Sequence, residues 1–103
     1  MSLPVHPHKL LIIIAEAALE RALTEDVKRL GAQGYTVHDV RGGGRHVTRI
    51  GDWDADRGIE MKVIATEAVA QAIARHIVET YCPHYSVTMF LAEGGVLRPE
   101  KFA

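Results

Sequence analysis

Hydrophobic residues recur along the chain with two different periods, which together predict four strands and two helices. The unbroken apolar run inside residues 9–15 is typical of a strand that is buried on both faces. Residues 35–40 are rich in β-branched and aromatic side chains, and residues 59–65 alternate hydrophobic with polar positions. Residues 85–91 give the last predicted strand, before a glycine turn at 94–95.

Two segments show the helical period instead. Residues 17–30 carry hydrophobic side chains at spacings of three and four, and Gly31 is suited to the position after the helix. The charged residues of this helix, Asp26 among them, are expected to be solvated. A second helix is predicted over 67–81, with Thr66 as its N-cap. The inner positions of the two helices are Leu19, Leu23, Val27, Leu30, Val69, Ile73 and Ile77.

The order of these elements predicts an α+β fold of the ferredoxin-like βαββαβ type with an antiparallel sheet. The first and third strands then lie in the middle of the sheet, and both helices cover one face. A chain of 103 residues has room for one domain, residues 1–103. Because two helices cover only one face, the apolar first strand indicates that something outside the chain covers the other, which favours an oligomer.

The connection between the second and third strands is about sixteen residues long, far beyond the usual hairpin loop. It begins with Gly42, Gly43 and Gly44, which stand between Arg41 and Arg45. Glycine backbones can form a concave nest of N–H groups, and guanidinium groups bind phosphate or carboxylate. The start of this loop is therefore a candidate anion site.

Composition excludes several classes of protein. The net charge is −1 and the basic residues are dispersed, so nucleic-acid binding is not expected. The single cysteine, Cys82, forms no intramolecular disulfide and fits a reducing compartment. The longest apolar run is too short to span a membrane, and no signal peptide is evident. A cytoplasmic protein is expected.

The sequence resembles a known family at these positions. Gly34-Tyr35-Thr36-Val37, followed by the arginine-flanked glycines, is similar to the start of the T-loop in PII signal-transduction proteins. The run Tyr81-Cys82-Pro83-His84-Tyr85 resembles the PII-like branch associated with bicarbonate transporters and carboxysomes. The resemblance covers almost the whole chain. It implies a homotrimer that binds adenine nucleotides in clefts between subunits and controls a target protein through the T-loop.

The resemblance also implies roles for individual residues. Thr36 and Val37 would border the adenine, the glycines and Arg45 would approach the phosphates, and backbone at 63–65 would contact the base. Arg98 in the C-terminal tail is a further phosphate candidate, with a disordered tail as the equal alternative. The predicted nucleotide residues are Thr36, Val37, Gly42, Gly43, Gly44, Arg45, Val63, Ile64, Ala65 and Arg98, and those for bicarbonate are Gly43, Gly44, Arg45 and His46.

Three departures from the PII pattern change what the resemblance implies about the ligands and the regulation. The turn at 82–85 lacks the glycines and lysine that grip terminal phosphates, so ADP or AMP is favoured over ATP, with cyclic AMP also open. His46 stands where a glutamine usually serves metal-bound 2-oxoglutarate. Residues 47–57 contain neither Tyr nor Ser, so ligands rather than covalent modification should act as the switch. No prosthetic group is implied.

Trp53, the only tryptophan, is in the loop between two aspartates, where it suits contact with a partner protein or a loop folded onto the core. No catalytic constellation is evident, and Cys82 and His84 should diverge around Pro83, so the protein is not expected to be an enzyme. Two alternatives remain. One is a trimeric divalent-metal protein of the same fold that uses His6, His8 or His84, and the other is a small enzyme with its site between subunits.

Overall fold

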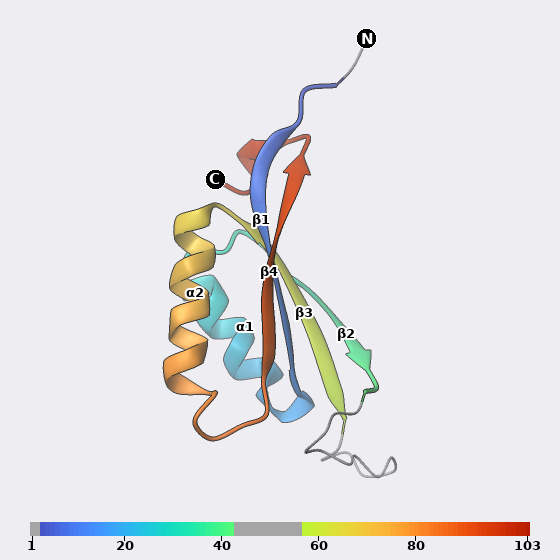
Figure 1. The fold of residues 1–103 in the computed structure, drawn as a ribbon, viewed down its shortest axis with the longest axis vertical. Helices are drawn as coiled ribbons and strands as arrows, with labels where there is room; N and C mark the ends of the chain where they lie inside the picture. Colours follow the sequence, from blue (N-terminus) through green and yellow to red (C-terminus); the bar gives the residue numbers. More distant parts are fainter. Residues whose placement is uncertain (1–2, 43–56) are drawn as a thin grey trace.

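The computed structural model describes residues 3–42 and 57–103 (Figure 1). The chain folds in the predicted order, with short 3₁₀ turns after the first strand and near the C-terminus. The elements are β1 (His6–Glu16), η1 (Ala17–Leu19), α1 (Glu20–Arg29), β2 (Thr36–Val40), β3 (Gly58–Ala65), α2 (Glu67–Thr80), β4 (Thr88–Val96) and η3 (Pro99–Lys101).

The four strands form one sheet in the order β2-β3-β1-β4, and every neighbouring pair is antiparallel. Leu11 in β1 is opposite Val63 in β3 on one side and Leu91 in β4 on the other. Both helices lie on one side of the sheet (Figure 1). The α+β ferredoxin-like fold, with the first and third strands in the centre, is therefore confirmed.

The core lies between the central strands and the two helices. Alternate side chains of β1 and β3 point toward the helices and are inaccessible or nearly so. Each buried leucine, isoleucine, valine or methionine among them contributes roughly 1.5–3 kcal/mol relative to an exposed one. The largest fully buried side chains are Leu11, Ile13, Leu23, Ile59, Met61, Ile73, Ile77, Val27 and Val63.

The opposite side of the sheet, which we call the open face, carries no helix among the described residues. Along β1 it presents Leu10, Ile12 and Ile14, of which Ile12 is buried and the other two are half-buried. On β4 it presents Phe90, whose side chain is 48% exposed and which is opposite Ile12. The centre of the open face is therefore apolar, as the unbroken hydrophobic run predicted.

Both predicted helix boundaries have the expected chemistry. The side chain of Thr66 accepts a hydrogen bond from the Val69 amide at 3.4 Å, so Thr66 is the N-cap of α2. After α1, Gly31 adopts a left-handed backbone with φ of 115°, and the Ala32 amide bonds the Val27 carbonyl at 2.9 Å. A side chain at Gly31 would oppose this conformation.

The last strand differs from its prediction. It runs over Thr88–Val96 rather than 85–91, and it includes Gly94 and Gly95, for which the sequence pattern predicts a turn. The reason is that β1 begins already at His6, which pairs with Val96, so β4 continues along it. Gly95 also packs closely on this extension, since a Cβ there would come within 2.1 Å of Val5 Cγ1.

Candidate functional site

The first part of the site is an uncovered stretch of main chain on β3. Strand β2 pairs with β3 only as far as Thr36 and Lys62, whereas β1 pairs with β3 up to Ala65. The residues 63–65 therefore have no strand partner on the β2 side among the described residues. Val63 and Ala65 direct their side chains into the core, so the main chain is what this edge offers to a ligand.

Some of the predicted nucleotide residues border this stretch. Thr36 is exposed and Val37 half-buried, and both stand at the start of β2 beside it. Ile64 is half-buried on the open face. A Cβ built at Gly42, two residues after β2, would meet no atom of the described residues within 4 Å apart from its chain neighbours. Arg98 follows β4, the edge strand opposite to β2, and the tail after it ends at Ala103, whose carbonyl accepts a hydrogen bond of 2.8 Å from Gln33 Nε2 just before β2.

The anion candidates Gly43, Gly44, Arg45 and His46 and the partner candidate Trp53 lie outside the described residues.

An ion pair closes the base of the long connection. Arg57 Nη2 lies 3.0 Å from Asp39 Oδ2, which joins the end of β2 to the residue before β3. The Arg57 carbonyl accepts a hydrogen bond of 2.7 Å from the Ala17 amide. Together these contacts fix the position at which residues 41–57 leave and rejoin the sheet.

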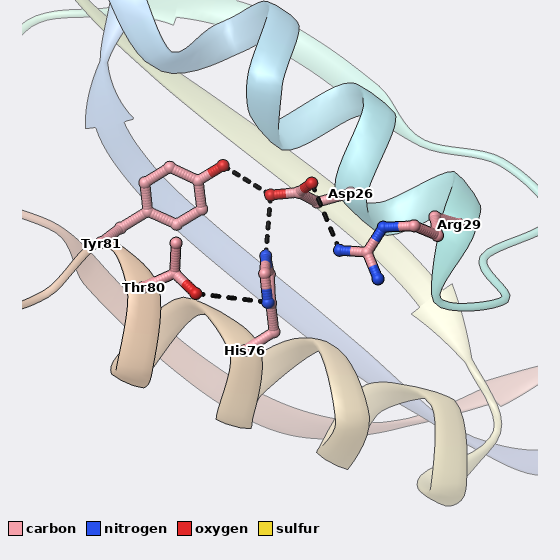
Figure 2. Close-up of polar contacts among 5 residues, drawn as sticks. All are labelled: Asp26, Arg29, His76, Thr80 and Tyr81. Carbon is pink, nitrogen blue, oxygen red and sulfur yellow. Dashed lines mark hydrogen bonds and ion pairs between the residues drawn. The ribbon is translucent and has the colours of Figure 1, made fainter.

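A second polar group joins the two helices. Asp26 Oδ2 on α1 accepts a hydrogen bond from the Tyr81 hydroxyl at 2.5 Å and another from His76 Nε2 at 2.8 Å (Figure 2). Arg29 Nη2 lies 3.4 Å from the other carboxylate oxygen. His76 Nδ1 is 3.3 Å from the Thr80 hydroxyl, so it accepts from that group when Nε2 carries the proton. We call these five residues the Asp26 cluster.

The cluster shifts the pKa of two of its members. Burial raises the pKa of Asp26, but the hydrogen bonds from Tyr81 and His76 outweigh it, so the net pKa is lowered. Burial and the bond to the Asp26 carboxylate raise the pKa of Tyr81 to about 12. At neutral pH the carboxylate is therefore ionised and the phenol is protonated, which is the state in which their hydrogen bond is strongest.

The cluster also anchors the turn that follows α2. The Tyr81 carbonyl accepts hydrogen bonds from the amides of His84 and Tyr85, at 3.0 and 2.9 Å. The expectation that Asp26 is solvated is wrong, since its side chain is only 20% exposed and fully engaged. In sequence it resembles the other charged residues of α1, and its partners, His76 on α2 and Tyr81 directly after it, are 50 and 55 positions away. No local pattern signals such a pairing.

A third polar group interrupts the open face. Glu60 Oε2 on β3 lies 2.9 Å from His38 Nε2 on β2 and 3.6 Å from Lys62 Nζ. His38 is directly opposite Glu60 in the register, so the three side chains form a row beside the apolar residues of β1. We call them the Glu60 row.

Two other kinds of site find no support in the part of the chain that the structure describes. No group of three or more histidine, cysteine, aspartate or glutamate side chains there is arranged to hold a metal ion. Among the same residues, neither helix combines the length and the apolar character needed to cross a membrane.

Comparison with known proteins identifies the family of this chain. The family model for nitrogen regulatory protein P-II matches residues 8–101. A PII-like signaling protein from Thermus thermophilus is 40% identical, with 98% of this chain and 100% of that one covered and a TM-score of 0.85. No curated protein matches the chain significantly.

A second solved protein is similar over the same length. CPII from Thiomonas intermedia, bound to ADP and bicarbonate, is 26% identical, covers 99% of this chain and 100% of its own, and has a TM-score of 0.88. CPII bound to ADP, AMP and bicarbonate is 25% identical with 98% of both chains covered and a TM-score of 0.86.

Proposed function

The chain belongs to the nitrogen regulatory protein P-II family, and we propose that it is an adenine-nucleotide sensor of the bicarbonate-linked PII-like branch. PII signalling proteins are non-enzymatic regulators, which agrees with the expectation that this protein is not an enzyme. The proposed ligands are ADP or AMP, with bicarbonate as co-effector. Homotrimers would hold the nucleotide in clefts between their subunits.

One observation carries this proposal. CPII, which was solved with ADP and bicarbonate and also with ADP, AMP and bicarbonate, is similar to this chain over nearly its whole length. The absence of glycine and lysine from residues 82–85 also favours a nucleotide without a third phosphate. The branch and the ligands are therefore proposed from relatives and from sequence together.

The geometry of the sheet is compatible with this site. The uncovered main chain at 63–65 offers hydrogen-bonding groups of the kind that read the edge of a base, beside Thr36 and Val37. Arg98 follows β4, the edge strand opposite to β2, and because the proposed cleft lies between subunits, Arg98 would reach the phosphates from a neighbouring copy. In a trimer the β4 tail of one subunit would meet the β2 edge of the next.

The proposed output is control of a partner protein. Ligand bound at residues 42–45 would change the state of the loop that follows and present or withdraw Trp53. The proposed target is a bicarbonate transporter or a carboxysome-linked protein, and the proposed location is the cytoplasm. The divalent-metal alternative has no observation in its favour among residues 3–42 and 57–103.

Calorimetric titration tests the proposal directly. The purified protein is titrated with AMP, ADP, ATP and cyclic AMP, each with and without bicarbonate. We expect sub-millimolar binding of ADP or AMP that bicarbonate tightens, because coupling between two ligands is reciprocal. Nucleotide binding that bicarbonate leaves unchanged would contradict bicarbonate as the co-effector. Absence of nucleotide binding would overturn the proposal that the protein is a nucleotide sensor.

A further inference from the structure

The segment that follows β4 is attached to its own subunit at two points. This segment, residues 97–103, includes the short turn η3, and we call it the strap. The Ala103 carbonyl accepts a hydrogen bond of 2.8 Å from Gln33 Nε2, which is 70 positions earlier in the chain. The Phe102 ring meets the His8 ring of β1 edge to face, with the two ring centroids 5.9 Å apart. The strap therefore runs from the β4 edge past β1 to the loop before β2.

Both attachment points lie at the end of the sheet that carries the uncovered main chain of β3. His8 is the residue before Lys9, which is opposite Ala65 in the register. Gln33 stands shortly before Thr36, the residue at which the pairing of β2 with β3 begins. Figure 1 shows the C-terminus at the same end of the sheet as the start of α2, the helix that directly follows the uncovered stretch. The strap is thus seated beside the edge that the proposed nucleotide would use.

Each attachment of the strap is weak. Gln33 is exposed, so water competes for both partners of its hydrogen bond with the strap. His8 Nδ1 is buried and has no hydrogen-bond partner among the described residues. A buried nitrogen without a partner costs free energy, and release of the Phe102 ring would return it to water. The strap is therefore held by contacts that a ligand can displace.

We propose that the strap is an autoinhibitory latch, which must leave Gln33 and His8 before a nucleotide can occupy the uncovered main chain of β3. This inference rests on the proposed function, because it concerns access to the same edge. In the latched state the strap also keeps Arg98 on its own subunit, where Arg98 Nε lies 3.4 Å from a Glu100 carboxylate oxygen. Release would uncover the edge and make Arg98 available to the neighbouring copy.

The latch has a calculable effect on affinity. A ligand that binds only the released state has an apparent dissociation constant equal to the intrinsic one divided by the released fraction. Removal of one latch contact raises that fraction by at most the strength of the contact, about fivefold for a hydrogen bond of ordinary net strength. Because linkage is reciprocal, the nucleotide must in turn release the strap.

Calorimetric titration with ADP compares the wild type with Gln33→Met, which keeps the length of the side chain but removes its N–H donor. We expect Gln33→Met to bind ADP about three- to fivefold more tightly. Gln71→Met is the matched control and should bind like the wild type, since Gln71 is the only other glutamine and is exposed on α2. Equal or weaker binding in Gln33→Met than in the wild type would overturn the latch.

The side-chain amide signals of the two glutamines, followed by nuclear magnetic resonance in isotope-labelled protein, report on the latch itself. At saturation with ADP we expect the Gln33 signals to move toward the position of the exposed Gln71, because the bond to the Ala103 carbonyl is lost. Gln33 signals that stay in place at saturation would overturn the proposal. Absence of ADP binding in both the wild type and Gln33→Met would contradict the proposed function, and the latch with it.

Discussion

Tyr81 and Asp26 join the two helices through a hydrogen bond of 2.5 Å between the phenol and the carboxylate. His76 donates to the same oxygen, so the end of α2 is held to α1 by two donors on one acceptor. The rest of the interface between the helices and the sheet is hydrophobic. The Asp26 cluster is therefore a directional contact within a core that is otherwise non-directional.

Removal of the Tyr81 hydroxyl should destabilise the fold measurably. We expect Tyr81→Phe to lower the free energy of unfolding by about 1.5–3 kcal/mol, the range for hydrogen bonds to a charged group. Urea unfolding followed by circular dichroism measures it. Tyr85→Phe is the matched control, since its side chain is exposed, and it should change stability by less than about 0.5 kcal/mol. Equal losses in both variants would contradict the assigned bond.

The Asp26 carboxylate should make stability depend on pH in acid. Its folded pKa is below the ordinary 3.8, so its contribution is present above the unfolded pKa and disappears as the pH falls through the folded one. We therefore expect Asp26→Asn to cost most near pH 7 and progressively less below about pH 4. Unfolding at several pH values measures this. The exposed Glu25, changed to Gln, should show little effect at any pH. A constant difference for Asp26→Asn would argue against the ionised acceptor.

Gly31 should tolerate no side chain. An alanine there would have a left-handed backbone and a Cβ 3.2 Å from Val69 Cγ2, so we expect Gly31→Ala to destabilise by about 1–3 kcal/mol. Gly34→Ala is the control, because its Cβ would meet nothing within 4 Å, and its effect should stay within about 0.5 kcal/mol. Thermal or urea unfolding compares the two. A neutral Gly31→Ala would show that the turn can adopt another conformation.

Arg45 should contribute to ligand binding but not to assembly of the oligomer. If its guanidinium binds the phosphates or bicarbonate, Arg45→Ala should weaken ADP binding by roughly tenfold or more, the equivalent of one charged hydrogen bond. Calorimetry measures the affinity, and sedimentation checks that the oligomer is unchanged. Arg49→Ala, four residues further along the loop, is the matched control and should bind normally. Unchanged affinity in Arg45→Ala would remove this residue from the site.

Periodicity was enough to predict most of the fold. The apolar alternation of β3 and the spacing of Leu23 and Val27 in α1 follow directly from which face each element buries. The caps at Thr66 and Gly31 also depend on local chemistry alone. These features can be predicted from sequence because the residues that determine each one lie within a few positions of it.

The features that were missed depend on residues far apart in the chain. The hydrogen bonds of Asp26 depend on His76 and Tyr81, on and directly after the other helix. The extension of β4 over Gly94 and Gly95 depends on its pairing with the start of β1. Glycine pairs usually mark turns, and only a long partner strand overrides that tendency. The grouping of the nucleotide candidates also depends on distant residues, since Thr36 begins β2 and Arg98 follows β4, the two edge strands of the sheet.

The pairing of His6 with Val96 has a consequence for the order in which the chain folds. The first strand of the chain cannot complete its ladder until the last strand has been synthesised. Until β4 pairs with it, a folding chain exposes an apolar edge of β1, and unpaired strand edges favour aggregation. Early docking of β3 on β1 would protect one edge, so the folding intermediate should consist of β1, α1, β2 and β3, with β4 added last.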